Sequence, residues 1–326
     1  MRNKGINPIR LLVFSIVLVL AFCTSAHAAF LNNGLSIRAL GMGNACVAVS
    51  QGASAWACNP AGLAGASRVE LESFYTQLLT GLDSVDISEN FASLAAPAGK
   101  YLGIGAYWFR MRGVSLYEEQ TGSLGIAVDF GSVLRMSPVK IGMNAKYLQA
   151  QFTLDERTLD DQVFSNGRAS SAVAFDVGLL AGQVVPKEGG FTFGAVARNL
   201  GEPNIGLYDS DRIPGEYQVG ICYWPGSLLI LNSYVIEEPA IAVDVSYRNG
   251  YLNFHIGWEH WFLNHTFGMR IGANRNQVTC GFSYDNAWTR SFDLGIDYAF
   301  IFPFEMTGTY GTHRASVFMR FGRQGR

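Results

Sequence analysis

The chain has 326 residues, a formal net charge of -2, 37 glycines, 13% aromatic residues and only 15% charged residues. The charged fraction is well below the roughly 25% of an ordinary soluble domain, which suits an outer surface that meets lipid, although a glycine-rich soluble β protein would have a similar composition. A near-neutral chain offers no basic face for phosphate groups, so we expect no nucleic-acid partner.

The N-terminus is typical of a cleavable signal peptide. Basic residues precede an apolar run over 11–22, and Ala26 and Ala28 are spaced as in a small-x-small cleavage site. The run is about a dozen residues, whereas a membrane-spanning helix needs roughly 20. We therefore predict that residues 1–28 are removed after export; an uncleaved anchor and a lipoprotein anchored at Cys23 are less favoured.

Residues 29–67 form a small, apolar, Gly/Ala-rich segment without strand alternation. The segment contains Cys46 and Cys58, which an oxidising periplasm would allow to pair in a disulfide. Two small buried thiols are the alternative. No CxxC or other metal-ligand spacing occurs among the cysteines of the chain, so no metal site is expected.

From residue 68 to 322, apolar residues alternate with polar or small ones at a period of two, the pattern of a strand with two different faces. In one segment, Val173 and Phe175 alternate with Ala174 and Asp176. The predicted strands are about nine to thirteen residues long, enough for a tilted strand to cross a bilayer. They run over 69–77, 89–97, 101–110, 123–130, 139–151, 171–183, 191–199, 217–224, 240–248, 251–262, 266–273, 277–285, 291–302 and 313–322. This makes about fourteen, an even number as expected for a single-chain bacterial barrel.

Two observations favour a transmembrane antiparallel β-barrel over a soluble periplasmic β protein, which is the structural alternative. No apolar stretch long enough for a spanning helix follows residue 30, and a closed barrel is the other structure that pairs every backbone group in lipid. Aromatic residues gather near strand ends, as in the girdles at lipid–water boundaries. Because the interior of so large a barrel is too wide for its own side chains to fill, we predict that the 29–67 segment folds inside the lumen as a hatch.

The connections also fit a barrel. Polar stretches at 155–170 and 199–215 are predicted as long loops on one side, and Asn249-Gly250 as a tight hairpin turn. The stretch 228–236 is ambiguous between a loop, a strand extension and an extra strand that would break the even number. The barrel is predicted to end at residue 322, which leaves 323–326 as a short periplasmic tail.

The charges of the predicted strands stand at positions of one parity, opposite to the large apolar side chains. Because a Lys or Arg on the lipid face costs roughly 2–4 kcal/mol at the midplane, this restriction assigns the charges to the lumen. There they hydrate the interior and pair with one another or with the hatch, or else select solutes. The candidate lumen-lining charges are Asp129, Lys140, Lys146, Asp176, Arg198, Asp244, Asp293 and Asp297, with Glu259, Arg314 and Arg320 on the same parity.

No catalytic or cofactor motif is specific in this sequence. The run from Gly41 to Gly43 approaches a dinucleotide fingerprint, but it lacks the third glycine and a preceding strand. His255, His260 and His265 are spaced by about 16 Å along a strand and alternate between its faces, so they form no shared metal site. We therefore expect no cofactor, no metal and no enzymatic activity.

Two runs near the N-terminus, 38–45 (RALGMGNA) and 59–64 (NPAGLA), resemble the hatch of the outer-membrane long-chain fatty-acid transporter (FadL) superfamily. The C-terminal pattern over 297–300 and 312–322 looks like the last two strands of its PorV/PorQ branch. The resemblance implies a plugged barrel in the bacterial outer membrane. The hatch residues that it singles out are Gly41, Gly43, Asn59, Pro60 and Ala61.

The resemblance implies two functions. The first is transport of hydrophobic small molecules across the outer membrane. The second is that of a PorV-like accessory barrel that binds exported proteins during secretion or surface attachment, with the loops at 155–170 and 199–215 as the contact surface. With either function we expect outer-membrane lipid and the barrel-assembly machinery as further partners.

Overall fold

The computed structural model describes residues 30, 34–50, 52–81, 86–114, 116–156, 158, 161–185, 188–226, 230–231, 234–235, 237–289, 291–305 and 308–322. The predicted signal peptide over 1–28 and the predicted tail over 323–326 lie outside these residues. Among the described residues, no helix is both long enough and apolar enough to cross a membrane.

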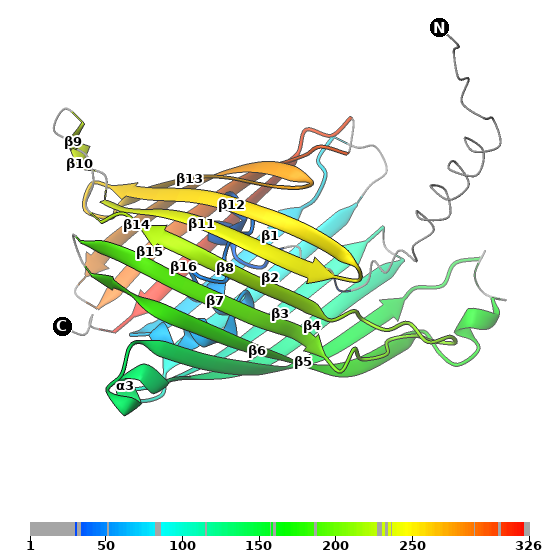
Figure 1. Cartoon of the computed structure of the whole chain (residues 1–326). Helices are drawn as coiled ribbons and strands as arrows, with labels where there is room; N and C mark the ends of the chain where they lie inside the picture. Colours follow the sequence, from blue (N-terminus) through cyan, green and yellow to red (C-terminus); the bar gives the residue numbers. More distant parts are fainter. Residues whose placement is uncertain are drawn as a thin grey trace, which may run out of the picture. The chain divides into compact units, whose positions relative to one another are not determined.

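The strands form one closed antiparallel barrel of fourteen strands, in which β1 pairs with both β2 and β16 (Figure 1). The predicted all-β barrel is therefore confirmed. The barrel strands are β1 (Val69–Gln77), β2 (Ile87–Pro97), β3 (Leu102–Gly113), β4 (Tyr117–Asp129), β5 (Val139–Phe152), β6 (Ala169–Val185), β7 (Gly189–Leu200), β8 (Glu216–Trp224), β11 (Glu237–Arg248), β12 (Tyr251–Phe262), β13 (Phe267–Asn274), β14 (Gln277–Thr289), β15 (Phe292–Pro303) and β16 (Thr312–Phe321).

The alternation of the sequence explains which face of each strand points outward. In β5 the side chains of Ile141, Met143 and Tyr147 are exposed on the outside, whereas Asn144 and Lys146 are buried on the inside. The same division is repeated around the barrel, so its outer surface is a continuous apolar band. Exposed apolar surface of this extent is stable against hydrocarbon rather than water, which makes these strands membrane-spanning.

The two ends of the barrel differ. β1 begins and β16 ends at the same end, which also carries the short helix α3 (Phe130–Leu134) (Figure 1). The described residues of the loops 153–168 and 201–215, which correspond to the predicted long loops, lie at the opposite end. Since bacterial barrels have long extracellular loops and short periplasmic turns, the long-loop end is extracellular and the end with the strand termini is periplasmic.

The ambiguous stretch near 228–236 does not add a barrel strand. β9 (Ile230–Leu231) and β10 (Tyr234–Val235) pair only with each other, as a two-stranded sheet separate from the barrel. β8 and β11 therefore pair directly and the even number is kept.

β4 shows the largest departure from the predicted boundaries. It begins at Tyr117 rather than at 123, because Glu118 pairs across the sheet with Arg110 on the outer face and so continues the strand through a polar stretch. The apolar alternation stops at this point in the sequence, although the backbone pairing continues.

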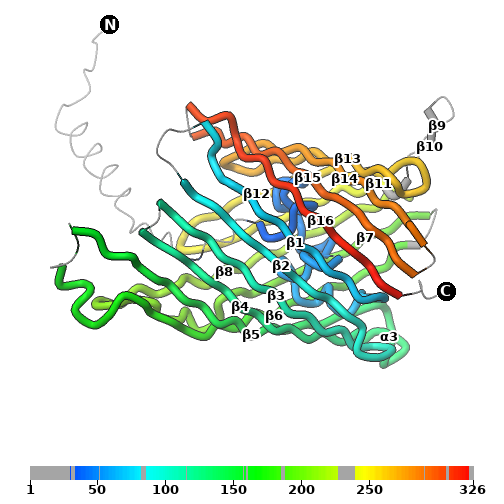
Figure 2. Tube along the Cα trace, turned by 180° about the vertical axis from the view of Figure 1, so that it is seen from behind, coloured from blue at the N-terminus to red at the C-terminus, as the bar shows by residue number. Residues whose placement is uncertain are grey.

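Residues 34–50 and 52–67 lie inside the barrel, where Figure 2 shows them as the blue segment between the strands. They form the helix α2 (Ile37–Gly41) and the 3-10 turns η1 (Ala55–Ala57) and η2 (Pro60–Gly65). The core of the protein is the interface between this segment and the inner wall. We call residues 34–67 the hatch below.

Candidate functional site in the lumen

The Asn-Pro-Ala motif, Asn59 to Ala61, connects two parts of the hatch with each other and with the barrel wall through hydrogen bonds of Asn59. The Asn59 side chain accepts a hydrogen bond from the Ala61 N–H (3.1 Å) and so caps η2, where proline fits because its missing N–H needs no partner. The Asn59 amide also donates to the carbonyl oxygens of Val47 (2.8 Å) and Leu179 (3.0 Å). One fully buried side chain thus links two parts of the hatch with β6.

Gly41 and Gly43 place the hatch backbone against the wall of β12 to β14. The Gly43 N–H donates to Thr279 Oγ1 (3.0 Å), and the Gly43 carbonyl oxygen lies 2.8 Å from His255 Nδ1. Gly43 has φ 67°, and a Cβ there would lie 2.6 Å from the backbone of Ala273, so no other residue fits this position.

Inward-facing glycines of the wall allow the hatch to approach the strand backbone equally closely elsewhere around the lumen. In each case a Cβ would meet the hatch: at Gly125 it would lie 2.8 Å from Trp56, and at Gly257 2.5 Å from the Met42 carbonyl oxygen. We call this set the glycine girdle. It consists of Gly103, Gly105, Gly125, Gly142, Gly178, Gly194, Gly220, Gly257, Gly272 and Gly281, on strands β3 to β8 and β12 to β14.

A disulfide joins Cys46 and Cys58, which are twelve positions apart in the sequence, and so links the two halves of the hatch. Both residues are buried. The Arg198 guanidinium donates to the Cys58 carbonyl oxygen (2.5 Å), so the bridged segment is also held by β7. Cys222 is buried and Cys280 exposed, and neither is bridged.

The central lumen charges form pairs on the inner wall of β5 to β8. Lys146 lies 2.7 Å from Asp176 and donates to the Asn199 side-chain oxygen (2.7 Å). Asn199 stands at a bulge where β7 slips against β6, and its N–H donates to Asp176 (2.8 Å). Arg198 pairs with Glu216 (2.5 Å).

Asp244 binds the hatch directly. One of its carboxylate oxygens accepts the N–H groups of Cys46 (2.7 Å) and Val47 (3.0 Å), together with the Gln218 side-chain amide (2.9 Å). The carboxylate therefore satisfies hatch N–H groups that no helix or strand pairs.

The remaining predicted charges lie nearer the periplasmic end. Asp293 pairs with Arg68 (2.5 Å) and Asp297 with Arg270 (3.3 Å). Asp129 ends β4, where its carboxylate accepts from the Ser132 N–H (2.9 Å) and caps α3. Lys140 lines a cavity of about 300 Å³ between the hatch and the wall, together with residues that include Arg38, Glu72, Asp285, Asp297, Arg270 and Arg320.

Sequence reasoning missed the ion pair that holds α2. Arg38 binds Glu259 through two nitrogens, at 2.8 and 2.5 Å, and Glu259 also accepts from Arg270. The partners Arg38 and Glu259 are 221 residues apart, so no local pattern signals their contact. The His255 contact with Gly43 was missed in the same way, since the sequence excluded a shared metal site for this residue but gave no partner for it.

A row of buried aromatic side chains lies on the inner wall of β1 to β3. The ring centroids of Phe74 and Phe91 are 5.2 Å apart, and those of Phe91 and Tyr107 are 5.9 Å apart. Tyr107 in turn lies 4.9 Å from Trp56 of the hatch. These four residues, which we call the aromatic ladder, lead from the wall to the plug, whereas the opposite wall of β5 to β8 is charged.

Among the described residues, no group of three His, Cys, Asp or Glu side chains could hold a metal ion. The lumen contains the hatch, the buried aromatic ladder and the ion pairs of β5 to β8. Fold and site thus define a closed membrane-spanning β-barrel with an internal N-terminal hatch.

Solved structures of hydrocarbon channels share this fold. The Ralstonia pickettii toluene transporter TbuX matches with a TM-score of 0.54 and 14% identity over 91% of this chain and all of that one. The monoaromatic hydrocarbon channel CymD gives 0.55 and 14% over the same shares. The Pseudomonas putida toluene transporter TodX gives 0.51 and 12%, over 88% of this chain and 97% of that one. At such identities the likeness establishes the fold alone. No protein-family model and no curated protein matches the sequence significantly.

Proposed function

We propose that the protein is a bacterial outer-membrane channel that admits small apolar molecules to the lumen through the aromatic ladder. The observation that carries the proposal is the continuous contact from Phe74 through Phe91 and Tyr107 to Trp56, a buried apolar path that leads from the inner wall to the hatch. Ring edges and faces bind aromatic solutes favourably. The fold shared with structures named as toluene transporters and hydrocarbon channels supports this substrate class.

The rest of the lumen limits what can pass. The strand registers of β2 to β5 are unbroken, so this wall has no gap between its strands. The hatch meets the glycine girdle over most of the circumference. Passage therefore needs a displacement of the hatch or of a strand, and the channel is a gated one rather than an open pore.

The test is uptake of labelled toluene and labelled palmitate by cells that lack the gene and by cells that express it again. We expect lower toluene uptake without the protein, and recovery on expression. The variant Phe91→Gln, which makes the ladder polar, should reduce the recovery at equal protein level. Tyr75→Gln on the outer face is the matched control. Equal uptake with and without the protein for both solutes would refute transport.

A second candidate function is binding of exported proteins, as the PorV/PorQ resemblance implies. The loops 153–168 and 201–215 extend from one end of the barrel and favour this candidate, because together they offer a contact surface. The loop 201–215 has buried side chains at Ile205 and Ile213 and is therefore a folded surface. Cross-linking at this loop in intact cells should capture secreted proteins if the candidate is correct, and envelope lipid alone if it is not.

A further inference from the structure

A group of charges stands on the outer face of the barrel. Among the barrel-strand residues whose side chains the structure describes, Arg110, Arg112 and Glu118 are the ones with a formal charge on the outward parity. This corrects the sequence-based assignment of all strand charges to the lumen. Arg110 lies 2.5 Å and Arg112 3.6 Å from Glu118, so two cations share one carboxylate. The Arg112 side chain is 53% exposed and has donors left for another anion.

These charges stand at the boundary of the apolar band. Along β3, outward side chains change from Ile104, Ala106 and Trp108 to Arg110 and Arg112 in the extracellular direction. The outward side chains of the neighbouring strands become polar at the same level. Ala92, Gly122 and Tyr147 stand at the level of Trp108, whereas Asn90, Gln120 and Gln149 stand at the level of Arg110. Carboxamides therefore surround the arginines at the level where lipid headgroups begin.

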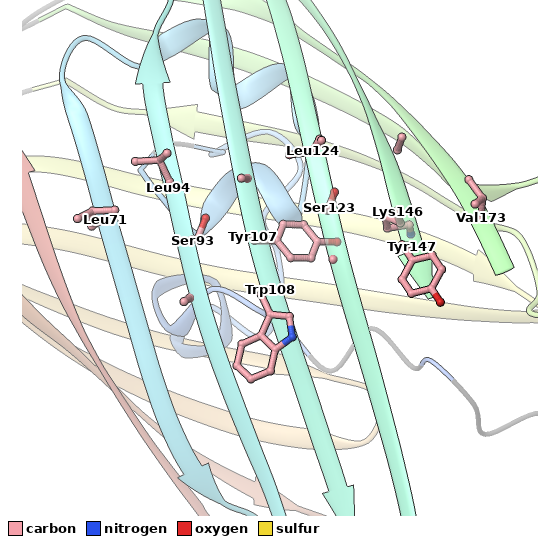
Figure 3. Close-up of a pocket in the computed structure, with 14 residues that line it drawn as sticks. Leu71, Ser93, Leu94, Tyr107, Trp108, Ser123, Leu124, Lys146, Tyr147 and Val173 are labelled. Carbon is pink, nitrogen blue, oxygen red and sulfur yellow. The ribbon is translucent and has the colours of Figure 1, made fainter. Parts of the chain in front are cut away.

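An apolar groove lies directly on the lipid side of this boundary. It has a volume of about 690 Å³, within the roughly 300–1,000 Å³ typical of ligand pockets. Figure 3 shows Trp108 of β3 and Tyr147 of β5 on either side of β4. Between them Gly122 has no side chain, and a Cβ there would meet no atom within 4 Å. The outer ends of the groove are lined by Leu71 and Val173.

We propose that this groove and the arginines above it form a binding site for a phosphorylated glycolipid of the outer leaflet, of the lipid A type. An acyl chain fits between Trp108 and Tyr147, over the gap that Gly122 leaves. A phosphate accepts hydrogen bonds from Arg112 and Arg110, as anionic headgroups do at basic sites. The carboxamides of Asn90 and Gln120 offer donors and acceptors to sugar hydroxyls, which a diacyl phospholipid headgroup uses less.

The site is separate from the lumen and from transport. The outward side chains of the groove stand on β1 to β6, whereas the side chains of the aromatic ladder and the hatch lie on the inside of the barrel. The extracellular orientation of this end selects the outer leaflet as the source of the lipid. A lipid held here covers the wall of β3 and β4 from outside.

The test is native mass spectrometry of the refolded full-length mature barrel with three probes: bis-phosphorylated lipid A, dephosphorylated lipid A and phosphatidylglycerol. We expect one tightly held bis-phosphorylated lipid A, and binding at least about tenfold weaker for each of the other two probes. The double variant R110Q/R112Q should lower the affinity for bis-phosphorylated lipid A to that for the dephosphorylated form. Arg275→Gln, which removes a charge from an exposed turn at the same end, should bind as the unmodified protein does.

A second pair of variants tests the groove. Gly122→Leu, whose Cβ would meet no atom within 4 Å, fills the gap and should weaken the binding of both forms of lipid A, while Ala315→Leu on the outer face of β16 should not. Heat-modifiable migration on a gel shows that each variant has folded. Unchanged affinity in R110Q/R112Q, unchanged affinity in Gly122→Leu, or equal affinity for phosphatidylglycerol would each overturn the assignment.

Discussion

A methyl group added to the glycine girdle should release the hatch. Gly142 on β5 faces η2, and a Cβ at this position would lie 2.5 Å from the Ala61 nitrogen, with Pro60 atoms equally close. Normal contact requires a separation greater by about 1 Å, and both sides of the contact are backbone, so no side chain can rotate away. Overpacking of this kind costs about 1–3 kcal/mol. Gly142→Ala should therefore raise the ratio of molecules with a displaced hatch to molecules with a seated hatch roughly 5- to 150-fold.

The assay is single-channel conductance of the purified protein in a planar bilayer, together with sensitivity of expressing cells to a large antibiotic that the outer membrane excludes. The matched control is Gly122→Ala on the neighbouring strand β4, where the added methyl group points outward and meets nothing. Gly142→Ala should give more frequent open events and a more sensitive strain than Gly122→Ala. If both variants conduct alike and denature alike, the hatch is not held by close backbone contact with the wall, and the reasoning fails.

Three further perturbations test the contacts of the lumen. Replacing both Cys46 and Cys58 by Ser should destabilise the hatch by about 3 kcal/mol, because the bridge removes the closure entropy of a loop of this length from the unfolded chain; proteolysis of the hatch under non-reducing conditions would measure it, and protection equal to that of the bridged protein would contradict it. Lys146→Met should cost about 3–5 kcal/mol by leaving Asp176 buried without its cation, whereas the double variant with Asp176→Leu should recover most of this loss in a urea titration. Asp244→Ala should lower the opening free energy of the hatch N–H groups by about 2–4 kcal/mol and so speed their hydrogen exchange. Unchanged exchange at the Val47 N–H would exclude the carboxylate as an anchor.

The barrel could be predicted from sequence because alternation is a local signal. Strands such as β1 and β12 coincide with the predicted 69–77 and 251–262, since both faces have a clear polarity and a turn follows. β4 was predicted too short because Glu118 interrupts the apolar face. Its ion-pair partner Arg110 is on β3, where the sequence of β4 gives no sign of it.

The hatch contacts could be predicted only in part. Asn59 and Gly43 stand in runs that resemble a known hatch, but their partners Leu179 and Thr279 lie more than a hundred residues away. The girdle glycines had a weak signal, as small residues on the inward parity. Which of them touch the plug depends on where each turn of the hatch meets the wall, and this is a property of the folded structure.

The glycine girdle also has a consequence for the order of biogenesis. Plug and wall interlock along strands on both sides of the lumen, from β3 to β8 and from β12 to β14, with backbone against backbone. A finished cylinder would leave no clearance for such a plug to enter from either mouth. The N-terminal segment must therefore already be compact when β1 and β16 pair. The wall is then completed around a hatch that is already in place.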